Sequence, residues 1–141
     1  MTDWNRVLDA YLSQTGTTLY GLVGTRVYPP PGMPRPIEPA ASVSFRQLPN
    51  AGNALEYPTH ERTQFEVVSW GVGPKAAREA ARAVFDLLNE VSHEDVTIDG
   101  STYRITWAQR TASEAEEPDQ EQPTVWLTVS TYEVVFIREA I

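Results

Sequence analysis

The chain has 141 residues and no cysteine, which excludes disulfides, thiolate catalysis and any zinc site built on cysteine. Its 11 lysines and arginines stand against 19 acidic residues, giving a formal net charge of −8, whereas tight DNA binding needs cations to neutralise phosphates. The length suits one domain with a hydrophobic core, and no apolar stretch is long enough for a membrane span. We therefore expect a single soluble domain over residues 1–141, with no membrane partner.

The first predicted element is an amphipathic helix over residues 3–13, with Thr2 as its expected N-cap. Its apolar residues recur at helical spacing: Trp4, Val7, Leu8, Tyr11 and Leu12. Residues 19–23 can add a further helical turn, which Gly24 would end. The proline-rich stretch 29–39 cannot form regular structure, and we expect an extended arm on the surface or against a neighbouring subunit.

Two stretches alternate polar and apolar residues, over 41–48 and 63–70, as strands of an antiparallel sheet with one solvated face do. A loop at 49–58 separates them. Residues 96–98 and 102–108 predict a hairpin across Asp99-Gly100, a common tight-turn dipeptide. The longest predicted strand, 124–137, carries apolar residues on both faces, so we expect it to be covered on both sides.

An alanine-rich amphipathic helix is predicted over residues 75–91, directly after Pro74, which suits the first helical turn. Its small side chains allow a close approach to a sheet. The fold class is therefore α+β: an antiparallel or mixed sheet of about four strands with two helices packed on one face. Three extended loops, 29–39, 49–58 and 111–123, complete the expected domain.

Five acids gather in one segment that has no basic residue and contains Pro118: Glu114, Glu116, Glu117, Asp119 and Glu121. Such a run predicts a solvated, mobile loop kept soluble by its charge. A second interpretation is an acidic surface that repels DNA or meets a basic partner.

Residues suited to catalysis or metal binding are few. His60 and His93, the two histidines, each adjoin acids, but neighbours in sequence seldom converge on one metal, and no HExxH spacing occurs. We interpret both as solvated turn histidines. Paired carboxylates occur only in the acidic segment, where nothing would desolvate them and raise a pKa. We expect no enzyme, and no catalytic, metal-binding or cofactor-binding residue.

The turn Gly71-Val-Gly-Pro-Lys-Ala76 matches the pattern of a dinucleotide-binding loop, because it follows a strand and opens a helix. Against that interpretation, the preceding strand alternates, whereas a parallel dinucleotide-binding strand is apolar on both faces. Asp99-Gly100 also serves better as a hairpin turn than as a ribose ligand. We favour glycines that let the chain reverse tightly.

The order of these elements resembles a known family. An N-terminal helix precedes Gly24-Thr-Arg-Val-Tyr-Pro29 and the proline-rich stretch, and the strand Gln64–Trp70, the helix Ala76–Leu88 and the closing strand Tyr132–Phe136 follow. Over about residues 4–137, this arrangement is similar to the tail terminator or tail-completion proteins of long-tailed bacteriophages, which include the minor tail protein U of phage lambda and tail-to-head joining proteins of Gram-positive phages.

The resemblance implies a structural virion protein made in the host bacterial cytoplasm. Members form a ring, probably a hexamer, on the head-proximal end of the tail tube, stop its polymerisation and present a surface to the head completion protein, while DNA passes through without specific binding. The resemblance makes the five acids of 114–121 candidates for facing the lumen. The candidates for contacts with a neighbouring subunit or the tube are Arg26, Tyr28, Pro30, Arg35, Asn53, Leu55 and Tyr57.

Two alternatives remain open from the sequence. Another head-tail connector, such as a neck or stopper protein, would share the small α/β architecture and ring assembly. A protein of a different class, a small nucleotide-binding domain, would use Gly71–Ala76. The composition of the three loops further predicts that they are disordered in a free monomer and become ordered in the assembly.

Overall fold

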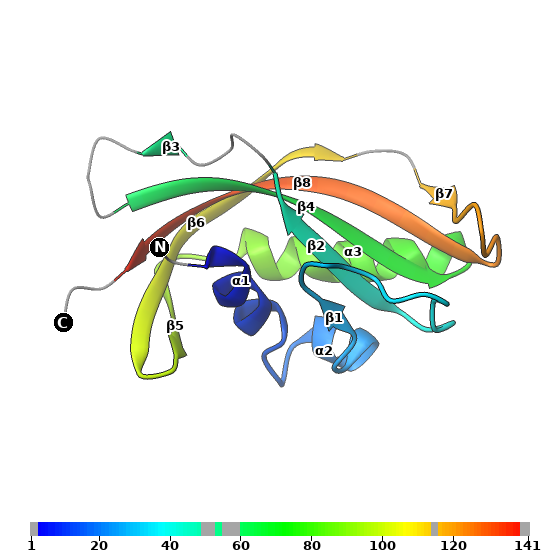
Figure 1. Ribbon diagram of the computed structural model, residues 1–141, viewed down its shortest axis with the longest axis horizontal. Helices are drawn as coiled ribbons and strands as arrows, with labels where there is room; N and C mark the ends of the chain where they lie inside the picture. The colour runs from blue at the N-terminus through cyan, green and yellow to red at the C-terminus, as the bar shows by residue number, and fades with distance from the viewer. Residues whose placement is uncertain (1–2, 49–52, 55–59, 114–115, 139–141) are drawn as a thin grey trace.

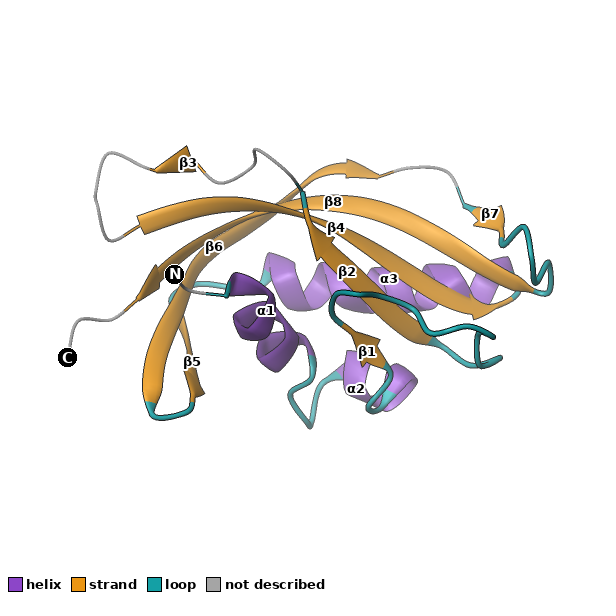
Figure 2. Cartoon of the chain, in the orientation of Figure 1, coloured by secondary structure: helices purple, strands orange, loops and turns teal. Residues whose placement is uncertain are grey.

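The structure is a computed structural model that describes residues 3–48, 53–54, 60–113 and 116–138. Its helices are α1 (Trp4–Leu12), α2 (Thr18–Val23) and α3 (Pro74–Asn89). Its longer strands are β2 (Ser42–Gln47), β4 (His60–Val72), β5 (Glu94–Ile98), β6 (Ser101–Ser113) and β8 (Val125–Arg138), and the two-residue strands are β1 (Val27–Tyr28), β3 (Asn53–Ala54) and β7 (Glu117–Pro118). The long strands arch over the three helices (Figure 1, Figure 2). None of the described helices is long and apolar enough to cross a membrane.

All strands join one sheet in the order β1-β2-β4-β8-β6-β5, with β3 added to β4 and β7 added to β8. Only the β1–β2 pair is parallel among the described strands. The α+β prediction is confirmed. The expected counts of about four strands and two helices are roughly compatible with the described residues, which form five longer strands, three two-residue strands and three helices. A two-residue strand is too short to show an alternation of polar and apolar residues, so the sequence does not predict it.

Helix α1 packs its predicted apolar stripe against the sheet, and all five residues of that stripe are buried. Trp4 stacks on Phe136 of β8, with 4.5 Å between ring centroids. The N-cap is Asp3 and not Thr2: its carboxylate accepts a hydrogen bond from the Asn5 amide at 3.0 Å. A single-residue shift of a helix end leaves the stripe unchanged, because the periodicity sets which face is buried.

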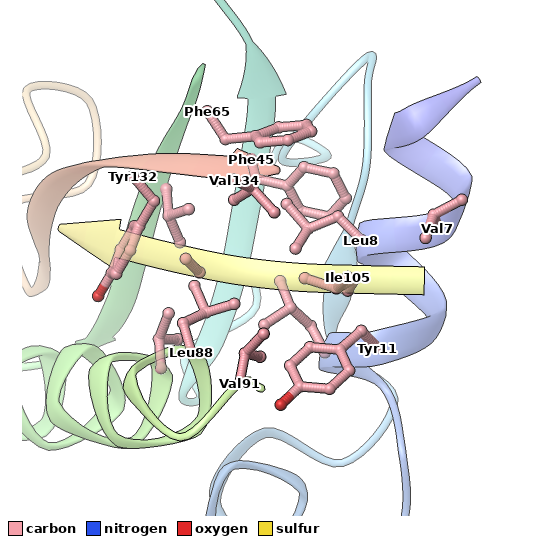
Figure 3. Packing of buried hydrophobic residues seen from close by; sticks show 14 of the residues in the cluster. Val7, Leu8, Tyr11, Phe45, Phe65, Leu88, Val91, Ile105, Tyr132 and Val134 are labelled. Atoms are coloured by element: carbon pink, nitrogen blue, oxygen red, sulfur yellow. The ribbon is translucent and has the colours of Figure 1, made fainter. Parts of the chain in front are cut away.

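The main core lies between the three helices and the near face of the sheet. Phe65 of β4 pairs with Tyr132 of β8, and their side chains point toward the helices beside Val134 (Figure 3). Leu88 and Val91 approach from α3 and its C-terminal end, and Leu8 and Tyr11 approach from α1 (Figure 3). Alternate residues of each strand therefore face the helices, and the residues that recur at helical spacing face the sheet.

The predicted hairpin is confirmed, with Asp99 and Gly100 both at positive φ, 50° and 80°, as a two-residue turn requires. Strand β6 is longer than predicted and continues from Ala108 to Ser113. Two register shifts bend it against β8, between Ile105 and Trp107 and between Arg110 and Ala112. The start of the expected loop 111–123 is therefore strand, and interrupted alternation at the bulges hides it from sequence.

Candidate interaction surface: the proline-rich arm and its clamp

The proline-rich segment 29–41, called the arm below, packs on the far face of its own sheet. Ile37 of the arm is 3% exposed and forms a second apolar cluster with Trp70 of β4 and Val125 of β8. Met33, Val68 and Leu127 flank that cluster. Register places Trp70 opposite Leu127 and Ser42, on the face turned away from the helices. The arm explains why β2 is buried on both faces.

An ion pair between a half-exposed arginine and a buried aspartate fastens the arm to the acidic segment. The Arg35 guanidinium donates two hydrogen bonds to the Asp119 carboxylate, at 2.8 and 3.0 Å. Asp119 is 6% exposed, and its Oδ2 also accepts the backbone amides of Glu121 and Gln122, at 3.1 and 3.0 Å. The Arg35 hydrogen bond is the main cause that holds the pKa of Asp119 below its usual value. Because it accepts these charge-assisted hydrogen bonds, the Asp119 carboxylate holds the surrounding loop in one conformation.

The side chain of Gln122 adds a second fastening. Its amide Oε1 accepts the Ile37 backbone N–H at 2.6 Å, and its Nε2 donates to the Ile37 carbonyl at 3.0 Å. Gln122 thereby satisfies both backbone groups of a buried residue, as a neighbouring strand would. We call Arg35, Ile37, Asp119 and Gln122 the arm clamp. It unites the arm with the segment 117–122 in one structured end of the molecule.

The structure describes the side chains of four of the seven predicted interface residues. Arg26 donates to the carbonyls of Ala41 and Leu22, at 2.8 and 3.3 Å, so it positions the base of the arm. Tyr28 is half-buried in β1, and Arg35 belongs to the arm clamp. Pro30 lines a groove of about 240 Å³ between the arm and the far face. The backbone of Asn53 pairs in β3, whereas its side chain, Leu55 and Tyr57 lie outside the described residues.

The four acids that the structure describes do not share one solvated loop. Asp119 is buried in the arm clamp, and Glu116 pairs with Arg78 of α3 at 2.9 Å. Glu117 and Glu121 are exposed, and Glu114 lies outside the described residues. The expectation that Asp119 is a solvated acid is therefore wrong, and the assignment of these acids to a lumen stays a prediction. The composition of the segment predicted that all its carboxylates are solvated. Arg35 of the arm makes burial of the Asp119 carboxylate possible, because it supplies a paired positive charge.

The expected monomer disorder of the loops is also contradicted where the structure describes them. Residues 29–39 are held by the arm clamp and the apolar cluster around Trp70, and 117–118 form β7 on the edge of β8. Most of the loop 49–58 lies outside the described residues. The arm was expected to lack periodic apolar anchors, yet the single residue Ile37 is enough to seat it.

The nucleotide-loop interpretation of Gly71–Ala76 does not fit the sheet. Strand β4 runs antiparallel to both of its neighbours, β2 and β8, whereas that class of site needs parallel strands. A Cβ on Gly71 would lie 2.6 Å from the backbone of Ala76 and Ala77. Gly71 therefore lets α3 approach β4 closely, and Gly73, with φ of 87°, turns the chain into the helix.

The histidines are placed differently from each other. His93 is an exposed residue at φ 55°, in the turn before β5, as expected. His60 instead begins strand β4 and is half-buried, so its turn interpretation is wrong. Among the described residues, no three histidine or acidic side chains are grouped as a metal site would require.

We expect Asp119→Asn to destabilise the fold by about 1–2 kcal/mol near neutral pH, because the half-exposed Arg35 loses its anionic partner. The depressed pKa of Asp119 means that its contribution is present above its unfolded-state pKa of 3.8 and is lost as the pH falls through the lower folded-state pKa. Urea unfolding of both proteins across that range measures the difference, which should shrink in acid.

The matched control is Glu121→Gln, because that exposed carboxylate lies 3.8 Å from the same guanidinium. It should change stability by no more than about 0.5 kcal/mol. Hydrogen exchange at the Ile37 amide supplies the local readout. A stability difference between wild type and Asp119→Asn that stays constant down to strongly acid pH would contradict the assigned ion pair.

Comparison with known proteins gives a shared fold. No protein-family model and no curated protein matches the chain. A solved structure of the virion of a native gene transfer agent particle contains a similar chain, with a TM-score of 0.55 and 17% identity, over 89% of this chain and 87% of that chain. A second solved structure has a TM-score of 0.52 and 12% identity, over 100% and 99% of the two chains. The chain thus has the fold of a gene transfer agent virion protein across nearly its whole length.

Proposed function

We propose that the chain is a structural, non-enzymatic virion protein of a phage or phage-like particle. In this proposal it forms a ring on the head-proximal end of the tail tube, terminates tail polymerisation and provides the surface that joins the head. The observation that carries the proposal is the fold shared with a protein of a gene transfer agent virion over nearly the full length of both chains. The proposed position at the head-proximal end of the tail tube rests on the sequence resemblance to tail terminators.

The sheet has two unlike edges, as ring assembly through unlike surfaces requires. One edge is the short strand β1, and at the other edge β5 pairs only with Ser101–Ile105 of β6. Within the described chain, β6 continues to Ser113 without a strand on its outer side. Contacts between unlike surfaces generate a closed ring when the rotation between copies closes. Unpaired strand edges are ready templates for a neighbouring chain.

The arm offers a preformed contact for the tube. The arm clamp and the apolar cluster around Trp70 hold it in place before any partner binds. A surface that is already ordered loses less conformational entropy on binding. Termination then follows sterically: one face of the ring docks on the last tube ring, and the opposite face offers no equivalent surface for another.

Passage of DNA is consistent with the remaining exposed acids. Glu117 and Glu121 lie at the clamped end of the molecule, and the chain carries a net charge of −8. Like charge around a channel disfavours adhesion of phosphates. In this proposal the exposed acids, and not the buried Asp119, contribute that field.

The proposal is tested by polymerising the tail tube protein of the same particle with and without the purified chain. Substoichiometric chain should arrest growth, so that tube lengths measured by negative-stain imaging shorten and stop increasing with time. An unrelated protein of similar size and net charge is the control. Tubes that grow to the same length in both samples would contradict a terminating role.

A further inference from the structure

The charges of α3 oppose the helix dipole. Lys75 lies in the first turn, which has no acidic residue, and Asp86 lies in the last turn, which has no basic residue. Glu90 follows as the C-cap. A helix N-terminus carries partial positive charge and a C-terminus partial negative charge, so this arrangement weakens the isolated helix. Folding of the single chain does not explain it.

The ion pairs within α3 do not compensate for this arrangement. Lys75 approaches Glu79 at 4.0 Å and Arg82 approaches Asp86 at 3.5 Å, each pair with its cation on the N-terminal side. That order is the weaker one for an i,i+4 pair. All four side chains are more than half exposed, so the pairs contribute little and can exchange partners.

One flank of α3 forms a basic groove with the sheet. The groove has a volume of about 480 Å³ and lies between α3, β6 and β8. Four of the 11 basic residues of the chain line it, against one acid, so the groove is basic on balance: Lys75, Arg78, Arg82 and Arg110, with Glu79, Ala81, Thr128 and Ser130. Arg78 also pairs with Glu116 at 2.9 Å, an exposed pair that a partner carboxylate can replace. Arg110 is held in place by its guanidinium, which lies 4.3 Å from the centroid of the Phe85 ring.

The groove contains a buried polar group without a partner. Thr128 is 9% exposed, and its Oγ1 has no hydrogen-bond partner within the described structure. Burying an unpaired hydroxyl costs free energy that a ligand or partner group can recover.

The other flank of α3 is acidic. Asp86 and Glu90 line a groove of about 280 Å³ against the loop and first turn of α2, beside Thr17 and Leu19. Helical spacing places Glu90 on a different side of α3 from Arg78 and Arg82, whereas Asp86 lies between the two flanks, where it pairs with Arg82 at 3.5 Å. A helix of 16 residues is about 24 Å long, so the basic half and the acidic half are also separated along its axis.

We propose that α3 forms the contact between neighbouring copies of this chain, with the basic groove of one copy receiving Asp86 and Glu90 of the next. The inference rests on the proposed ring and names the surfaces that close it. A second copy is favoured because each chain presents both complementary halves, and unlike halves generate the head-to-tail contact that a ring requires. The overall negative charge opposes nucleic acid as the occupant.

The test reverses the charges of each flank in the full chain. Arg78→Glu with Arg82→Glu, or Asp86→Arg with Glu90→Arg, should each weaken self-association by at least about tenfold in sedimentation velocity at low salt. An equimolar mixture of the two variants should assemble again, because alternating copies restore every contact in an even-numbered ring. The chain with all four changes should also self-associate, since both halves are exchanged.

The control separates this contact from net charge. Arg6→Glu with Arg46→Glu changes the net charge by the same amount as the basic-groove variant, at exposed ion pairs away from α3. It should assemble as the wild type does. The variant with all four changes restores the wild-type net charge, so its recovery cannot arise from general repulsion.

Three results of the assembly experiments would overturn the inference, and one binding result would do the same. The assembly results are reversal variants that assemble normally, mixtures that do not recover, and a wild-type chain that stays monomeric at about 100 µM and low salt. An oligonucleotide or an acidic peptide bound through Arg78 and Arg82, with self-association unchanged in the reversal variant, would also overturn it. Tube termination by chains that assemble normally despite the reversals would leave the proposed function intact.

Discussion

Replacing Trp70 by alanine is expected to lower the free energy of unfolding by about 3–5 kcal/mol. The ring is 6% exposed and packs with Ile37 and Val125, so truncation leaves a cavity between the arm and the sheet. Its Nε1 donates to Ser44 Oγ at 2.9 Å, and the Arg35 guanidinium lies 5.9 Å from the ring centroid. Urea unfolding followed by far-ultraviolet circular dichroism measures the loss.

Two further substitutions separate the contributions. Trp70→Phe retains most of the apolar contact but leaves the buried Ser44 hydroxyl without its donor, and should cost about 1–2 kcal/mol. Trp107→Ala removes a tryptophan that is 41% exposed on the same sheet and should change stability by less than about 0.5 kcal/mol. Equal losses at Trp70 and Trp107 would contradict the seating of the arm on the far face.

The second large effect is expected at Gly71. Gly71→Ala should destabilise the fold by about 3 kcal/mol, at the upper end of the usual cost of overpacking. The new Cβ would lie 2.6 Å from the carbonyl carbon of Ala76 and from the backbone nitrogen of Ala77. Those atoms belong to α3 and cannot rotate away, so the helix must shift from β4. Chemical denaturation and thermal melting both report the change.

Gly21→Ala provides a control of opposite sign. Gly21 lies within α2, its φ is not positive, and a Cβ there would meet nothing within 4 Å. The substitution should therefore stabilise the chain by about 0.5–1 kcal/mol, the helix preference for alanine over glycine. If Gly71→Ala were as harmless as Gly21→Ala, the close approach of α3 and β4 would be disproved.

These two positions show which part of the fold is readable from sequence. Alternation in β4 and the stripe of α3 predicted both elements, because each buries one face against the same core. The glycine pattern at 71–76 resembled a cofactor loop, since close packing of a strand and a helix needs small residues in either setting. Antiparallel pairing on both sides of β4 separates the two, and pairing depends on distant segments.

The arm clamp could not be predicted in the same way. Arg35 and Asp119 are 84 residues apart and lie on irregular segments, so no period relates them. One local signal was present: Asp119 follows Pro118 and precedes Gln122, and an aspartate in such a position accepts backbone amides in a turn. A composition argument treats all five acids alike and misses the one that is buried.

The positions of the charges on α3 could be predicted from the sequence, but their division into two interaction surfaces could not. Amphipathicity assigns Arg78, Arg82 and Asp86 to a solvated face. Only the neighbours of the helix divide that face into two flanks: β6 and β8 on the basic side and α2 on the acidic side. A surface for assembly is therefore visible in the packing around the helix and not in its periodicity.

The central claim is that copies of this chain close a ring on one end of a tail tube, and imaging of tube ends tests it most directly. Tubes assembled with the chain should show, in averaged negative-stain or cryo-electron images, a ring of additional density at one end only. The Arg78→Glu, Arg82→Glu variant should leave the ends bare. Decoration along the tube wall, or bare ends with the wild-type chain at saturating concentration, would contradict the account.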